Sequence, residues 1–119
     1  MSDSLNDIIQ NLSDSHADIE SAYLFTVDGL ILSVNQRDTL IDEIGATAAA
    51  IKSIAERSSH LLYRGEMQQV HIFSKQGSLI MTGVKDDMIL VALIREQANI
   101  GMIFHEIKTS AQKISHLFS

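Results

Sequence analysis

Residues 19–33 read IESAYLFTVDGLILS, and this stretch decides the fold. Two apolar segments, residues 19–26 and 30–34, flank the tripeptide Val27-Asp28-Gly29. Asp-Gly supplies the positive φ angles that a tight hairpin turn requires, so the stretch predicts two antiparallel strands. Apolar side chains occupy both alternating faces of the first segment. It is therefore expected to be an inner strand that is covered on both sides.

The same reasoning extends to the rest of the chain. Residues 88–94 read MILVALI, which predicts a second strand buried on both faces. Apolar residues three or four positions apart predict helices, and turn signals separate further strands. The expected helices cover residues 4–13, 39–62 and 100–118, and the expected strands cover 19–26, 30–34, 67–74, 78–84 and 88–94.

This order, α-β-β-α-β-β-β-α, predicts an α/β fold of a definite kind. Every strand-to-strand connection is a hairpin except the one through the second helix, so the five-stranded sheet should be mostly antiparallel. Two strands need cover on both faces, which requires a three-layer α/β/α sandwich. The length of 119 residues corresponds to one domain over residues 1–119.

Three helix starts carry capping signals. Ser4 followed by Asp7 resembles a capping box, and Asn99 is a good N-cap for the last helix. Asp38 or Thr39 is expected to cap the second helix. Within that helix, a buried stripe is expected from residues three or four apart, namely Ile41, Ile44, Ala48, Ile51, Ala55 and Ser58.

Composition excludes several classes of protein. The formal net charge of −6 argues against nucleic-acid binding, and the absence of cysteine excludes disulfides and thiolate metal sites. The N-terminus does not read as a signal peptide, and no apolar run is long enough to span a membrane. We therefore expect a cytoplasmic protein that does not insert into membranes.

The sequence offers little for catalysis or cofactor binding. Its glycines form no phosphate loop or dinucleotide motif, and its five histidines are scattered without ligand spacing. Asp28 and the pair Asp86-Asp87 fit hairpin turns, so turn chemistry explains them. Arg37 lies in a loop, where an arginine finger or a solvated side chain would fit. We expect no enzyme activity, no metal and no cofactor.

The second helix carries an unusual face opposite its buried stripe. Small residues, where lysine and glutamate are usual, occupy this face at Ala46, Ala49, Ala50 and Ser53. They either provide a contact face or simply favour the helix. In an antiparallel pair of such helices, Asp42 and Glu43 of one copy would approach Lys52 and Arg57 of the other. We therefore predict a homodimer through this helix, with an edge strand at residues 66–73 beside it.

Residues 19–33, with Asp28-Gly29, resemble the opening hairpin of the roadblock / dynein light chain domain family. The helix rich in small residues, the three-strand meander and Asn99-Ile100-Gly101 are similar to its bacterial branch of small-GTPase regulators. The resemblance implies a profilin-like sandwich and a non-enzymatic dimer that binds a Ras-like small GTPase. It also implies that the dimer forms through the second helix and the edge strand, at Gly45, Ala46, Ala49, Ala50 and Ser53.

The predicted function is a homodimeric regulator or scaffold of a Ras-like small GTPase. Two alternatives stay open: a structural light-chain scaffold without effect on nucleotide turnover, and a small-ligand sensor. For the sensor, His71 on the third strand is the best pocket residue. The predicted interaction residues are Asp42, Gly45, Ala46, Ala49, Ala50, Ser53 and Arg57.

Overall fold

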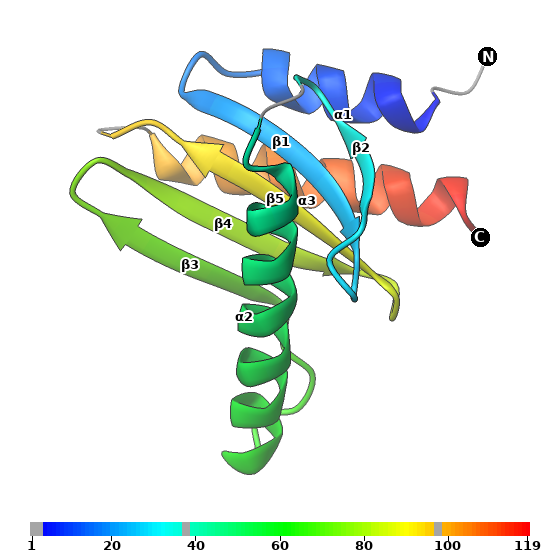
Figure 1. The fold of residues 1–119 in the computed structure, drawn as a ribbon, viewed down its shortest axis with the longest axis vertical. Coiled ribbons are helices and arrows are strands. Elements are labelled where there is room, and N and C mark those ends of the chain that lie inside the picture. Colours follow the sequence, from blue (N-terminus) through cyan, green and yellow to red (C-terminus); the bar gives the residue numbers. More distant parts are fainter. Residues whose placement is uncertain (1–3, 37–38, 97–98) are drawn as a thin grey trace.

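The computed structural model describes residues 4–36, 39–96 and 99–119. Within them the chain forms three helices and a five-stranded sheet, in the predicted order (Figure 1). The elements are α1 (Leu5–Asp14), β1 (Ile19–Thr26), β2 (Ile31–Val34), α2 (Ile41–Leu61), β3 (Gln69–Ser74), β4 (Gly77–Val84), β5 (Met88–Ile94) and α3 (Ile100–Leu117).

The sheet is antiparallel throughout, with strand order β2-β1-β5-β4-β3. The predicted inner strands β1 and β5 lie side by side near its centre, with Leu24 opposite Leu90. Both side chains are fully buried, as are Tyr23 and Phe25 on β1. The expectation that β1 and β5 are covered on both faces is therefore confirmed.

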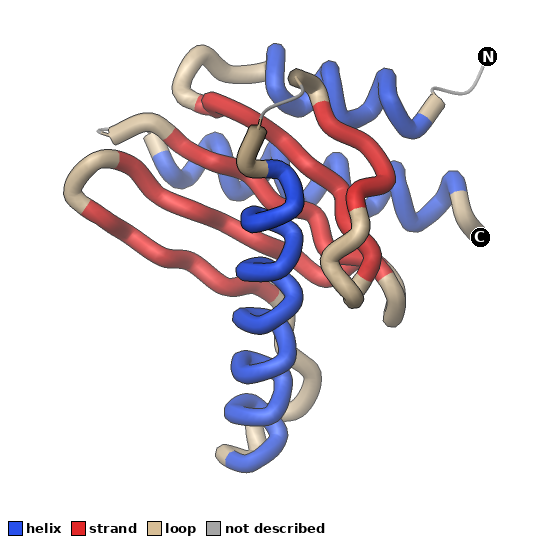
Figure 2. The backbone as a smooth tube through the Cα atoms, viewed as in Figure 1, coloured by secondary structure: helices blue, strands red, loops and turns tan. Residues whose placement is uncertain are grey.

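Helices cover the two faces of the sheet (Figure 2). On one face, α1 and α3 bury their isoleucine and leucine side chains against Leu24, Ile80 and Leu90. On the other face, α2 packs through Ile41 and Ala48 against a cluster of aromatic and aliphatic side chains, namely Tyr23, Phe25, Met81, Ile89 and Val91. The predicted three-layer sandwich is thus confirmed.

Two of the three predicted helix caps are confirmed. Ser4 accepts a hydrogen bond from the backbone N–H of Asp7 and completes a capping box, and Asn99 accepts from the N–H of Met102. The expected cap at Thr39 is wrong, because α2 begins later and Leu40 occupies its N-cap. Asp38, the alternative cap, and Arg37 lie outside the described residues.

Strand β3 begins at Gln69, two residues after the predicted start. Side chains take up the backbone groups of the two preceding residues. The N–H of Met67 donates to the Glu56 carboxylate at 3.3 Å, and the carbonyl of Gln68 accepts from the Thr82 hydroxyl at 3.1 Å. The N–H of Met67 and the carbonyl of Gln68 are thus hydrogen-bonded to side chains, and the pairing of β3 with β4 starts at Gln69.

Strand β2 is short and irregular. Leu24 of β1 pairs with Ser33 and Phe25 pairs with Ile31, so Leu32 is an extra residue without a register partner. This is a β-bulge, which bends the strand and increases its local twist. Leu32 is exposed on the outer edge of the sheet as a result.

Candidate functional site

Helix α2 is longer than the sheet it crosses, and its C-terminal half extends past the edge formed by β3 (Figure 1). The predicted buried stripe therefore holds only in part. Ile41 and Ala48 are buried and Ile51 and Ala55 are half-buried, but Ser58 is exposed because no sheet lies beneath it.

Large apolar side chains are exposed on this extending half. Ile54 is 64% exposed, Leu61 is 77% exposed, and Tyr63 just beyond the helix is 94% exposed. Tyr63 also has a positive φ of 57°, a conformation that bulky residues seldom adopt. Apolar side chains grouped in this way typically mark an interaction site.

The predicted small-residue face is continuous with this apolar group. Ala46, Ala50, Ser53 and Arg57 are all exposed, and Ala49 at the margin is half-buried. With Ile54 and Leu61, they recur three or four positions apart and so lie along one side of α2. Asp42 is exposed beside its start. We call this set Ala46, Ala50, Ser53, Ile54, Arg57 and Leu61 the outer stripe.

Gly45, the remaining predicted interaction residue, lies elsewhere. It is buried against the β1–β2 turn of its own chain, where its backbone meets that of Gly29. A Cβ atom on Gly45 would come within 2.9 Å of the Phe25 ring and closer still to the Gly29 carbonyl oxygen. Gly45 thus allows α2 to approach the hairpin and has no surface on the outer stripe.

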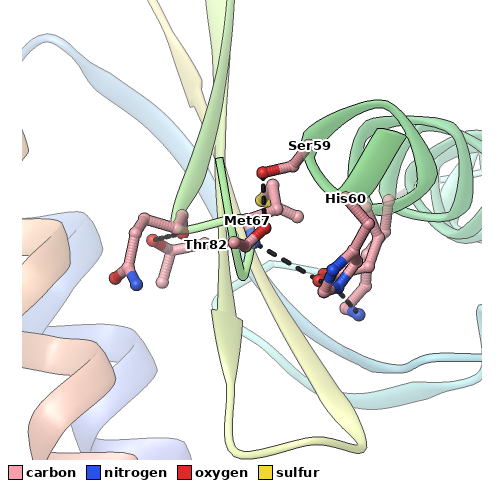
Figure 3. Close-up of polar contacts among 8 residues, drawn as sticks. Ser59, His60, Met67 and Thr82 are labelled. Carbon is pink, nitrogen blue, oxygen red and sulfur yellow. Dashed lines mark hydrogen bonds and ion pairs between the residues drawn. The ribbon is translucent and has the colours of Figure 1, made fainter. Parts of the chain in front are cut away.

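Glu56 connects α2 to the segment that leads into β3. Its carboxylate accepts from the N–H of Met67 and lies 3.8 Å from the Lys52 ammonium and 3.1 Å from the His60 imidazole. Figure 3 shows His60 and Ser59 on α2 beside the segment that carries Met67. The Ser59 hydroxyl also donates to the carbonyl of Gly65 at 2.6 Å. These bonds fix the direction in which α2 leaves the sheet.

Replacing Glu56 by alanine should lower the free energy of unfolding by about 1–2 kcal/mol. The change removes one charge-assisted hydrogen bond to the backbone and two i,i+4 pairs on the helix surface. Urea denaturation of both proteins measures the difference. Glu96→Ala is the control, because Glu96 is exposed, has no ion pair among the described residues and lies outside the outer stripe. Equal stability of the two variants would contradict the role given to Glu56.

The Lys52–Glu56 ion pair also changes the predicted contacts between two copies. Lys52 is half-buried and engaged within its own helix, so it is poorly placed to meet a carboxylate of another copy. Arg57 is exposed and has no ion pair among the described residues. Arg57 is therefore the better placed of the two basic residues.

Strand β3 forms one edge of the sheet, as predicted, and pairs only with β4 among the described strands. Val70 and Ile72 face the α2 side, where Val70 joins the apolar cluster. His71 faces the other side, where its ring stacks on Phe104 of α3 with centroids 4.2 Å apart. Partial desolvation of the imidazole lowers the pKa of His71, although the residue as a whole remains exposed. The edge is thus a regular strand with unused backbone groups, close to the outer stripe.

The described residues offer no obvious centre for metal chemistry. No group of three or more histidine and acidic side chains is arranged among them to hold a metal ion. Within the same ranges, no helix combines the length and the apolar character needed to cross a membrane.

Comparison with known proteins bears on this arrangement. The profile of the Roadblock/LC7 domain matches residues 5–94, from the start of α1 to the end of β5. This chain belongs to the Roadblock/LC7 family. Two uncharacterised proteins of Methanocaldococcus jannaschii are each 29% identical to it over 101 residues, which cover 84% of the chain and 88% of each relative.

Solved structures share the whole fold of this Roadblock/LC7 chain. MglB of Myxococcus xanthus superposes with a TM-score of 0.88 at 17% identity, over 96% of this chain and 94% of its own. A Roadblock/LC7 domain from Streptomyces avermitilis gives 0.87 at 21% identity, over 98% and 100%. Acanthamoeba castellanii profilin II gives 0.72 at 12% identity, over 98% and 100%. The roadblock, profilin-like fold predicted from the sequence is confirmed.

Sequence reasoning missed part of the outer stripe. Ile54 and Leu61 are exposed, like Ala46 and Ala50, yet they were not among the predicted interaction residues. A signal was available, because at 100° per residue both positions fall outside the predicted buried stripe. Only the structure shows that the sheet ends before α2 does, which leaves these side chains uncovered.

Proposed function

We propose that this Roadblock/LC7 chain is a non-enzymatic homodimer that regulates or scaffolds a Ras-like small GTPase. The observation that carries the proposal is the outer stripe, which joins small and large apolar residues on one side of α2 next to the free β3 edge. A surface of this kind suits a helix-to-helix contact beside a strand-to-strand contact. Proteins of similar fold include the gliding protein MglB of Thermus thermophilus.

The outer stripe is complementary to itself when two copies run antiparallel about Ala50. Positions equally far from Ala50 then face each other, so Ala46 of one copy meets Ile54 of the other. A large side chain thus fits against a small one. Glu43 likewise meets Arg57, which pairs opposite charges. A two-fold axis repeats each contact, as a closed dimer requires.

The β3 edges would extend the same dimer. Two antiparallel β3 strands across the axis would satisfy backbone groups that otherwise face water. They would join two five-stranded sheets into one. The half-buried Val70 and the more exposed Ile72 on the α2 side would then be shielded further. Helix and strand contacts together bring the interface closer to the area that stable dimers bury.

The function is tested with the Ras-like small GTPases of the same organism, beginning with one from a neighbouring gene where such a gene exists. Pull-down with the GTPase loaded with GDP or a GTP analogue measures binding, and phosphate release with and without this protein measures turnover. Regulation predicts binding together with a change in hydrolysis rate. Binding without a rate change would favour the scaffold. Absence of binding in both nucleotide states would contradict the proposed function.

A further inference from the structure

A groove lies on the face of the sheet opposite α2. It runs between α3 and the adjoining ends of β3 and β4, and its volume is about 640 Å³. This falls within the range of 300–1,000 Å³ that is usual for small-molecule sites. Figure 2 shows α3 and α2 on opposite sides of the sheet, so the groove is separate from the outer stripe.

The charge of the groove is opposite to that of the protein. Lys85, Lys108 and His105 line it together with three glutamines, and none of its lining residues is acidic. The whole chain has a net charge of −6. Lys52 and Arg95 form ion pairs within the chain, whereas neither groove lysine has one among the described residues. The two ammonium groups therefore give the lining of the groove a positive charge, while the carboxylates of Glu66 and Asp86 lie in the adjoining hollow on the other side of Lys85.

Lys85 is held in an unusual position. Its φ of 53° lies in the left-handed region, where glycine or asparagine would be less strained than lysine. Its ammonium donates to the carbonyl of Phe118 at the end of α3, at 2.7 Å. An ammonium has three donor hydrogens, so two remain for another acceptor. This hydrogen bond holds the ammonium of Lys85, which lines the groove, close to the end of α3.

The walls supply uncharged donors and an apolar surface. Gln68 and Gln112 can donate amide hydrogens from opposite sides of the groove. Phe104 and Ala111 of α3 and Val84 of β4 supply the apolar part. The Phe104 ring also stacks on the imidazole of His71, which does not line the groove itself. Cations, amides and an apolar wall together suit a ligand with an anionic end and an organic body.

We propose that this groove binds a phosphorylated small molecule. Lys85 and Lys108 would bind its phosphate oxygens, because ammonium groups form charge-assisted hydrogen bonds with phosphate. The amides of Gln68 and Gln112 would bind the remaining oxygens, and the organic part would lie against Phe104. The ligand binds on the α3 face, so each copy of the protein carries its own site.

Isothermal titration calorimetry with inorganic pyrophosphate and with ATP tests the site. Lys85→Asn and Lys108→Gln should each weaken binding about tenfold, the loss expected for one charge-assisted hydrogen bond. Asparagine tolerates the backbone conformation of residue 85, so Lys85→Asn should fold normally. Lys113→Gln is the matched control, because Lys113 lies on α3 outside the groove and should leave binding unchanged. Higher salt should weaken binding in the wild type.

Other outcomes would overturn the proposal. These are no heat with either phosphate compound, an equal loss in the Lys113→Gln control, or binding to vesicles that contain phosphoinositides but to no soluble phosphate. The result is also independent of the proposed dimer. A monomeric Ala50→Glu protein should bind pyrophosphate as the wild type does, because Ala50 belongs to α2, which lies on the other side of the sheet.

Discussion

Replacing Gly45 by alanine is expected to lower the free energy of unfolding by about 3 kcal/mol, one of the larger effects of a single methyl group. The added Cβ would overlap the Gly29 carbonyl and press on the Phe25 ring, which is fully buried. Neither neighbour can move away easily. Gly29 sits at the turn with a φ of 90°, and Phe25 is in the middle of the α2-side core. Helix α2 would have to shift away from the β1–β2 hairpin.

Urea or thermal denaturation of Gly45→Ala measures this loss. Gly101→Ala is the control, because a Cβ there meets nothing closer than 3.7 Å and the residue is also helical. Alanine is the better helix former, so the control should be unchanged or more stable by up to about 1 kcal/mol. If Gly45→Ala were as stable as the control and only lost its partner, Gly45 would belong to the dimer interface after all.

Replacing Ala50 by glutamate is expected to weaken the proposed dimer by at least about 100-fold, or about 2.7 kcal/mol. Ala50 is exposed at the centre of the outer stripe. On a two-fold axis the two new carboxylates would lie next to each other, where they would be both desolvated and mutually repelled. The larger side chain would also hold the helices apart. The monomer should remain folded because Ala50 does not contact its own core.

Sedimentation velocity over a range of concentrations measures the dimer affinity. Asn11→Glu adds the same side chain to the exposed surface of α1, and should leave the affinity unchanged. Exchanging charges tests the direction of the helices: Arg57→Glu should weaken the dimer, and adding Glu43→Arg should restore it. An Ala50→Glu protein that dimerises as tightly as the wild type would exclude α2 as the contact.

Most of the fold was predictable because its signals are local. The Asp28-Gly29 turn, the seven apolar residues of β5 and the capping residues Ser4 and Asn99 each act over a few positions. The errors in the predicted element boundaries lie where contacts with residues distant in the sequence override the local signals. The start of β3 depends on a hydrogen bond that Glu56 accepts and on one that Thr82 donates, and both residues are distant from it in the sequence.

The candidate site was predictable only in part. Alanines on an exposed helix face are visible in the sequence, and they led to the outer stripe. The buried position of Gly45 could not be predicted from the sequence. It depends on how closely α2 approaches the β1–β2 hairpin, where the backbones of Gly45 and Gly29 meet. The groove beside α3 could not be predicted either, since Lys85 comes from the β4–β5 turn and Lys108 from α3, and only the folded structure brings them to one groove.

The bulge at Leu32 limits how far such an assembly can grow. Each copy has two sheet edges, and in the proposed dimer the regular edge strand β3 is already paired with β3 of the other copy. The remaining edges are the β2 strands, each four residues long and interrupted by the unpaired Leu32. A further strand would find only a short, bent ladder there, so a continuous fibril is disfavoured. The same irregularity that ends the sheet thus keeps the assembly finite.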